Sequence, residues 1–189
     1  MSMGDSQPRR FLIQMSGYPG SGKSTIVKML SREISGVVID HDVNKSAILE
    51  SGHSWQLASK LAYGVGWDIA NFYLKNELSV LIDSACFYSE IIKSGQDLAQ
   101  RHNVEYWYIE CKVDDTSILE SRLQTRTSHR SQRMSINRLP LDIVDDAVTE
   151  DPGALFTKEP VRPHKNCIIV DSSDEKEKVL ASITERLGL

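Results

Sequence analysis

The sequence is poor in cysteine. Cys86, Cys111 and Cys167 lie far apart, are odd in number and form no C-x-x-C pair, which argues against a disulfide framework and against a zinc site. Unpaired cysteines are typical of proteins in a reducing compartment. We therefore expect a cytoplasmic protein.

Long apolar runs are missing as well. No stretch approaches the roughly 20 consecutive apolar residues that a membrane-spanning helix needs, and residues 1–10 lack the apolar core of a signal peptide. We expect no membrane partner. A chain of 189 residues is long enough to bury one substantial core, so we expect a disordered tail at 1–10 and a single domain at 11–189.

An excess of positive charge is also absent. The 22 Lys and Arg residues are outnumbered by 26 Asp and Glu residues, which gives a net charge of −4. The chain as a whole therefore lacks the basic footprint of a duplex-binding protein. Local basic patches are still compatible with this composition, so nucleic acid stays open as a less favoured partner. The composition does not indicate an oligomeric state.

What the sequence does contain is a glycine-rich phosphate-binding motif. Residues 17–25 read GYPGSGKST, match G-x-x-x-x-G-K-[ST] at every fixed position and directly follow the apolar run at 11–15. The glycines allow the backbone N–H groups to turn toward a polyphosphate, and a helix that begins after the loop adds its positive N-terminal end. The residues expected to contact a nucleoside triphosphate are Gly17, Tyr18, Pro19, Gly20, Ser21, Gly22, Lys23, Ser24 and Thr25.

Two residues of the motif receive chemical roles. Lys23 should reach the β- and γ-phosphates as a point charge, and the Ser24 hydroxyl should ligate the Mg²⁺ that bridges them. The plain alternative is a strand-to-helix turn without a ligand, but the succession of strand, loop, Lys-Ser and helix disfavours it. ATP and Mg²⁺ are therefore the expected cofactors, although the motif does not separate ATP from GTP.

Apolar runs and amphipathic patterns alternate along the chain, which implies βαβ units and a parallel sheet covered on both faces. In such an α/β fold, ligands bind at the carboxyl ends of the strands. We expect strands at 11–15, 37–40, 79–83, 104–111 and 167–171, and helices at 23–34, about 54–76, 90–102, 116–126 and 174–187.

Two further local features accompany this pattern. Ser172 and Glu175 have the spacing of a capping box for the last helix. The stretch 130–163 contains four prolines and has no regular pattern, so we expect it to be irregular.

Aspartates follow two of the predicted strands. Asp83 fits the Walker B role of holding Mg²⁺ directly or through water. Asp42 is the expected general base or hydrogen-bond acceptor for an acceptor hydroxyl, and Asp40 is either a second carboxylate of the metal site or a structural cap. Each could also be an ordinary turn or N-cap residue, but carboxylates at these strand ends face the same crevice as the phosphate loop.

A series of arginines follows the fourth strand: Arg122, Arg126, Arg130 and Arg133, with Arg138 beyond. If the predicted helix continues, the first four fall on one stripe at ~100° per residue. Like charges at this spacing repel one another, so the series favours a negatively charged ligand beside it. A triphosphate would be such a ligand. The alternative is a solvated basic face or a nucleic-acid contact.

We favour a mobile, arginine-rich helical lid at about 120–140. Guanidinium groups suit phosphate oxygens, so Arg122 and Arg126 are expected to stabilise the transferred phosphoryl group, with Arg122 also contacting the nucleotide. Closure of the lid would exclude water from the reaction.

The segment 55–73 is rich in aromatic residues and contains Gly64 and Gly66, which we expect to interrupt its helix. Most of these aromatics are better explained as core. Trp55 and Tyr63 lie nearest the second strand's crevice and are the expected members of an acceptor pocket.

Five segments together resemble one known group of enzymes. GYPGSGKST, VVIDHDVNK, SVLIDSA, ILESRLQTR and IIVDSS are similar to the small P-loop kinases related to phage polynucleotide kinase, chloramphenicol phosphotransferase and zeta-toxin sugar kinases. The resemblance implies a three-layer P-loop NTPase fold, with a five-stranded parallel sheet in which the Walker B strand neighbours the phosphate-loop strand.

The resemblance also implies roles for individual residues. Asp42 takes the position of the aspartate that accepts the proton of the acceptor hydroxyl, and Arg122 and Arg126 take those of the lid arginines. Lys45 falls where the polynucleotide kinase has an acceptor-side arginine. This is a departure from the pattern, because lysine lacks the bidentate fork that recognises a phosphate.

Three functions are compatible with the sequence. The favoured one is an ATP- and Mg²⁺-dependent kinase that phosphorylates a hydroxyl group of a small molecule, with an acceptor side formed by Asp40, Asp42, Lys45, Trp55 and Tyr63. The second is a polynucleotide 5′-hydroxyl kinase. The third is a non-enzymatic nucleotide switch or a simple NTPase.

Overall fold

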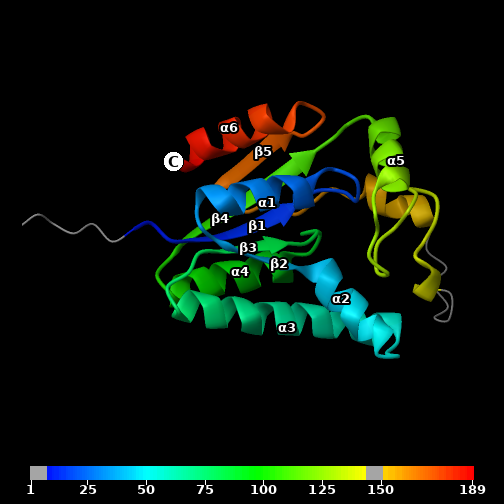
Figure 1. The fold of residues 1–189 in the computed structure, drawn as a ribbon, viewed down its shortest axis with the longest axis horizontal. Coiled ribbons are helices and arrows are strands. Elements are labelled where there is room, and N and C mark those ends of the chain that lie inside the picture. Colours follow the sequence, from blue (N-terminus) through cyan, green and yellow to red (C-terminus); the bar gives the residue numbers. More distant parts are fainter. Residues whose placement is uncertain (1–7, 144–150) are drawn as a thin grey trace, which may run out of the picture.

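A five-stranded parallel sheet lies between two layers of helices (Figure 1). This computed structural model describes residues 8–143 and 151–189. The strand order is β2-β3-β1-β4-β5, so the Walker B strand β3 pairs with the phosphate-loop strand β1, and the predicted fold class is confirmed. The strands are β1 (Phe11–Ser16), β2 (Val37–Asp40), β3 (Val80–Asp83), β4 (Glu105–Lys112) and β5 (Cys167–Asp171).

Helices α1 and α6 cover one face of the sheet, and α3 and α4 cover the other (Figure 1). Helix α2 follows β2, and α5 stands apart at the carboxyl ends of the strands. The helices are α1 (Lys23–Glu33), α2 (His41–Glu50), α3 (Trp55–Lys75), α4 (Ser89–Arg101), α5 (Thr116–Thr125) and α6 (Lys176–Leu187), with short 3₁₀ helices η1 (Leu141–Ile143) and η2 (Pro152–Thr157).

The central strand β1 is buried on both faces, which explains its almost continuous apolar sequence. Phe11, Ile13 and Met15 belong to the core against α1 and α6, whereas Leu12 belongs to the core against α3 and α4. Burial on both faces holds the carboxyl end of β1, and with it the start of the phosphate loop, in a fixed position.

Helix α2 is not predicted by the sequence pattern. Leu49 is its one buried apolar residue in the described structure, so no apolar stripe marks it. The helix begins instead with a cap: the Asp40 carboxylate accepts hydrogen bonds from the backbone N–H groups of Asp42 (2.9 Å) and Val43 (3.3 Å). This cap places Asp42 in the first turn of a helix.

Helix α3 is continuous, so the predicted interruption at Gly64 and Gly66 is wrong. Each glycine costs a helix interior only about 1 kcal/mol relative to alanine. Burial of Ala70 and Leu74 against the sheet and contacts with α2 outweigh that cost, since a helix is stabilised mainly by its packed face.

Helix α5 ends at Thr125, and Arg126 is extended with ψ 150°. The helix therefore does not continue through Arg130 and Arg133, and the predicted single stripe of four arginines is wrong. The predicted helical lid at about 120–140 is therefore helical only as far as Thr125 and has no further helix up to η1. Of the stretch 130–163 that we expect to be irregular, residues 144–150 lie outside the described residues.

The predicted capping box at Ser172 is also wrong. The N-cap of α6 is Glu175, and no side-chain cap hydrogen bond is present there in the described chain. The Ser172 hydroxyl donates instead to the carbonyl oxygens of Ser21 (2.7 Å) and Lys112 (3.1 Å). Ser172 therefore ties the end of the sheet to the phosphate loop.

The predicted tail at 1–10 is described only from residue 8 onward. Arg9 forms a bidentate ion pair with Glu105 (2.7 and 2.8 Å) and donates to the Leu187 carbonyl oxygen (2.8 Å), so the described chain contacts the domain before the predicted boundary. Within 8–143 and 151–189, no helix has both the length and the apolar character needed to cross a bilayer.

Candidate nucleotide and acceptor site

At Gly17 and Gly20, the phosphate loop has a backbone conformation and close contacts that only glycine accommodates. Gly17 has φ 128° and Gly20 has φ 86°, in the region that L side chains rarely adopt. A Cβ at Gly17 would lie 2.2 Å from the Cys111 carbonyl oxygen, and one at Gly20 would lie 2.8 Å from that of Leu119. The loop is thus packed against β4 and α5 without space for side chains.

Lys23 is folded across the loop that precedes it. Its ammonium group donates to the carbonyl oxygens of Gly17 (2.9 Å) and Tyr18 (3.0 Å). Helix α1 begins at this residue, after Gly22 in the left-handed conformation. A cationic side chain and the N-terminus of a helix therefore lie together, which is the arrangement that binds phosphate.

A cavity of about 550 Å³ borders the loop. This volume is within the range of small-molecule sites, about 300–1,000 Å³. Its lining comes from the loop, α1, the lid and the start of α6. The predicted site residues that line it are Gly20, Gly22, Lys23, Ser24, Thr25, Asp40, Arg122 and Arg126.

The other predicted loop residues lie elsewhere. Gly17 and Tyr18 line a second cavity of about 230 Å³, near the end of β4. Ser21 is buried, and its hydroxyl has no hydrogen-bond partner among the described residues. Pro19 is half-buried in the turn.

Asp83 is buried beside Ser24 at the end of β3. Burial raises the pKa of its carboxyl group, and the Lys23 charge and a hydrogen bond with Ser24 oppose that rise. Its Oδ2 atom has no partner within the described chain. Asp40 ends the neighbouring strand in register with Asp83. A carboxylate and a hydroxyl are the hard oxygen ligands that Mg²⁺ prefers, so these residues fit the ion.

Mg²⁺ is normally held by one or two carboxylates together with substrate phosphates. The described residues contain no group of three or more His, Cys, Asp and Glu side chains that could hold a metal ion.

Asp42 is contacted by the lid on both of its carboxylate oxygens. The Ser131 hydroxyl donates to Oδ1 (2.9 Å), and the Gln132 amide donates to Oδ2 (3.0 Å). These two lid residues were not predicted from the sequence, and the only local signal for them is their place within the arginine-rich segment.

The remaining acceptor-side residues, together with His41, form two side-chain pairs. The Lys45 ammonium lies 3.3 Å from the centroid of the Trp55 ring, a cation–π contact, and the His41 and Tyr63 rings lie 4.0 Å apart. Burial lowers the pKa of Lys45 to about 8, although the nearby Asp42 opposes this. The structure therefore brings together every residue predicted for the acceptor side.

The pKa of the His41 imidazole is lowered strongly. Burial lowers its pKa to about 4, with Asp42 acting in the opposite sense and Lys45 in the same sense. The imidazole is therefore neutral at pH 7, and it lines a small cavity together with Tyr63 and Asn44.

The lid arginines are held by backbone carbonyls. Arg122 donates to the Ser172 carbonyl oxygen (2.9 Å) and Arg126 to that of Arg133 (2.8 Å). Burial lowers the pKa of Arg126, whereas the charges of Asp42 and other carboxylates nearby raise it; a guanidinium nevertheless stays charged in proteins.

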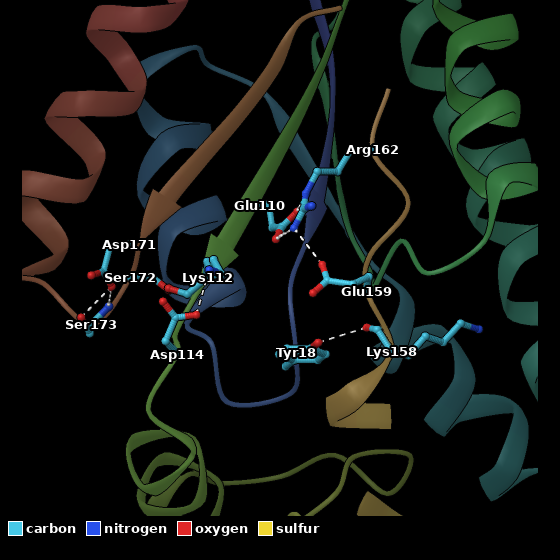
Figure 2. Close-up of polar contacts among 10 residues, drawn as sticks. All are labelled: Tyr18, Glu110, Lys112, Asp114, Lys158, Glu159, Arg162, Asp171, Ser172 and Ser173. Carbon is cyan, nitrogen blue, oxygen red and sulfur yellow. Dashed lines mark hydrogen bonds and ion pairs between the residues drawn. The ribbon is translucent and has the colours of Figure 1, made fainter. Parts of the chain in front are cut away.

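A segment after the lid covers the outer side of the phosphate loop, a feature that the sequence does not predict. The Tyr18 ring lies 5.7 Å from Phe87 and 5.5 Å from Phe156 between ring centroids, and its hydroxyl donates to the Lys158 carbonyl oxygen (3.0 Å; Figure 2). Phe156 and Lys158 of this segment thus contact Tyr18 of the phosphate loop, and Phe87, which follows β3, contacts the same ring.

A buried ion pair anchors the same segment. Arg162 donates twice to the Glu110 carboxylate (2.7 and 2.8 Å; Figure 2), and Glu110 is 1% exposed. The hydrogen bonds from Arg162 compensate the burial of this carboxylate, and in return Glu110 raises the pKa of Arg162. Bidentate geometry of this kind is among the stronger charge-assisted contacts.

The fold and the phosphate loop define a P-loop NTPase domain. A model of the AAA_33 family, described as an AAA domain, matches residues 12–148. The chain therefore belongs to the AAA_33 family. A comparison with curated protein sequences gives no significant match.

Several solved structures of the same fold are named as kinases. A protein of Chloroflexus aurantiacus that is provisionally designated a kinase has a TM-score of 0.68 at 18% identity, covering 97% of this chain and 98% of its own. A sugar kinase from Janibacter has a TM-score of 0.63 at 15% identity (96% and 95% covered).

The APS kinase of Mycobacterium tuberculosis, in complex with AMPPNP and APS, has a TM-score of 0.63 at 13% identity (97% and 100% covered). At these identities, the likeness establishes the fold and leaves the substrate open.

Proposed function

We propose that this protein is an ATP- and Mg²⁺-dependent kinase that transfers the γ-phosphoryl group to a hydroxyl group of a small molecule. One observation carries the proposal: the carboxylate of Asp42, in the first turn of the helix that follows β2, accepts a hydrogen bond from Gln132, which lines the 550 Å³ cavity, and the Lys45–Trp55 and His41–Tyr63 pairs come from the same helix and from α3. A protein that only hydrolyses or senses a nucleotide needs no such acceptor side. The sugar and APS kinases of the same fold support it by analogy.

The donor would be held by the loop and two side chains. Lys23 would exchange the loop carbonyls for the phosphate oxygens, which are stronger partners for an ammonium group. Ser24 and Asp83 would hold Mg²⁺, which when bound neutralises charge on the phosphates. Arg122 and Arg126 would stabilise the charge on the phosphoryl group during transfer, and Asp40 would cap α2 at the edge of this site.

The acceptor would lie between Asp42 and the two side-chain pairs Lys45–Trp55 and His41–Tyr63. Asp42 would orient the hydroxyl group and receive its proton as the new oxygen–phosphorus bond forms and ADP leaves. Lys45, Trp55 and Tyr63 would border the rest of the acceptor. Closure of the lid would exclude water, so that the phosphoryl group passes to the alcohol.

The contacts of the lid arginines give less support to the alternative function, a polynucleotide 5′-hydroxyl kinase. Arg122 and Arg126 donate to backbone carbonyls, and Arg130 is paired with Asp142 (2.6 Å), so these three arginines do not form an open basic face. Binding to single strands would weaken steeply with added salt, whereas a neutral small acceptor would show little dependence.

Site-directed variants test the proposal. Lys23→Ala and Asp42→Asn should each lower phosphoryl transfer by at least ~10²-fold, the usual scale for a positioned charge or an acid–base group. Lys93→Ala and Asp97→Asn are matched controls, because these residues form an exposed ion pair on α4. Wild-type turnover in Asp42→Asn would remove Asp42 from its role.

The readout is ADP release from ATP and Mg²⁺ in a parallel acceptor screen. The panel contains nucleosides, sugars including gluconate, adenosine phosphosulfate, antibiotics and 5′-hydroxyl oligonucleotides. A single responsive class identifies the acceptor. ADP release that no acceptor changes would instead favour an NTPase or a nucleotide switch, and calorimetry that detects no uptake of ATP or GTP would overturn the proposal altogether.

A further inference from the structure

We propose that Ser131 and Gln132 are positioning residues for Asp42, and that they align its carboxylate only while the lid is docked on α2. This inference rests on the proposed function, because it takes Asp42 to be the group that receives the proton of the acceptor hydroxyl.

The two contacts fix the carboxylate plane. Ser131 donates to Oδ1 (2.9 Å) and Gln132 to Oδ2 (3.0 Å), so each oxygen has one donor from the lid. An ionised carboxylate has about four lone-pair sites. One site on each oxygen therefore remains for an acceptor hydroxyl, and the lid orients Asp42 without blocking it.

Ser131 is a buried, anchored residue, with 6% of its surface exposed. Its backbone N–H donates to the Ser46 hydroxyl (2.9 Å), and the Ser46 hydroxyl donates to the Ser131 hydroxyl (3.1 Å). The neighbouring Arg130 donates to the Leu49 carbonyl oxygen (3.1 Å). These contacts all lie between the lid and α2, so the Ser131 hydroxyl reaches Asp42 only when the lid is docked.

The same lid segment also borders the cavity proposed to hold the nucleotide. Gln132 lines the 550 Å³ cavity together with Arg126, and Arg126 is held within the segment by Ser128 (3.3 Å) and the Arg133 carbonyl oxygen (2.8 Å). One movement would therefore bring the arginine to the phosphates and align the carboxylate. Until the lid docks, Asp42 lacks both donors, which would limit transfer to water before the acceptor is bound.

The test uses Ser131→Ala and Gln132→Met, which remove one donor each. Gln132→Met keeps the length of the side chain, and it serves as the independent variant if Ser131→Ala does not fold. The controls are Ser121→Ala and Gln124→Ala on α5, where both side chains are exposed. ADP release from Mg·ATP is measured in water alone and with the acceptor that the screen identifies, and thermal unfolding checks the fold of each variant.

Each test variant should lower kcat with the acceptor by about 10-fold, since a hydrogen bond to a charged group is typically worth a factor of ten or more. The KM for ATP should change much less, and the controls should behave like the unmodified protein. In an Asp42→Asn background, the same substitutions should produce little further loss, because their effect is exerted through Asp42. A merely structural role for Ser131 and Gln132 would not give this non-additivity.

Four results would overturn the inference. Unchanged kcat in both variants, with a large loss in Asp42→Asn, would refute it and leave the proposed function standing. A full 10-fold loss in the Asp42→Asn background would show that the two residues act elsewhere. A rise in kcat in Ser131→Ala would mean that the serine competes with the acceptor. If Asp42→Asn itself retains full activity, the proposed role of Asp42 fails, and this inference fails with it.

Discussion

Lys45→Met should raise the free energy of unfolding at neutral pH, although it removes a charged contact. Lys45 is 8% exposed, and burial lowers its pKa from the ordinary 10.5 to about 8. At 1.36 kcal/mol for each pKa unit, this shift corresponds to a penalty of about 3 kcal/mol for the buried ammonium. The contact with the Trp55 ring acts on the same charge, so its effect is expressed through this pKa and is not subtracted again, and the penalty at pH 7 is about 3 kcal/mol.

The sign of the pH dependence follows from the two pKa values. Between about 8 and 10.5, the unfolded chain binds more protons at Lys45 than the folded chain does, so stability rises with pH across this window. The penalty is fully present below pH 8 and is lost above pH 10.5. Methionine carries no charge, keeps the unbranched length of lysine and packs well against aromatic rings, so the variant lacks the penalty at every pH.

Urea unfolding at pH 7 and pH 10 measures this difference. The variant should be more stable than the unmodified protein by up to about 3 kcal/mol at pH 7, and most of this advantage should be lost by pH 10. A variant that is less stable at pH 7, or whose difference does not change with pH, would refute the reasoning. A gain in stability with a loss of phosphoryl transfer is the expected combination for a residue retained for function.

Two further substitutions test the fold. Gly64→Ala should raise the free energy of unfolding by about 0.5–1 kcal/mol, because α3 is continuous and a Cβ there meets nothing within 4 Å among the described residues; a destabilised variant in urea unfolding would contradict this. Arg162→Ala should lower the free energy of unfolding by about 3 kcal/mol, because it leaves Glu110 as a buried charge without its ion-pair partner. Lys112→Ala, which breaks the exposed pair with Asp114, is the control and should change it by less than about 1 kcal/mol.

The strands were predictable to within a residue or two because parallel strands buried on both faces read as apolar runs. Observed β1 and β3, for example, differ from the predicted 11–15 and 79–83 by one residue each. The aspartate at the end of β3 was predictable for the same reason, since the run ends where the chain leaves the sheet.

Helix boundaries at the acceptor side were not predictable to the same degree. Helix α2 depends on the cap at Asp40 rather than on an apolar stripe, and α3 continues through two glycines because of its packing against the sheet. The end of α5 at Thr125 depends on contacts that the irregular lid makes with α2, which are distant in the sequence.

The sequence by itself determined the donor half of the site. The phosphate loop is one contiguous segment, and local backbone preferences and a helix N-terminus are sufficient to make it a phosphate-binding element. Only the tertiary structure decided the long-range contacts that hold the predicted acceptor residues and the phosphate loop in place. Asp42 meets Ser131 and Gln132 across separations of 89 and 90 residues, and Ser21 meets Ser172 across 151. Such contacts depend on how whole elements pack, and no local pattern of residue types encodes them.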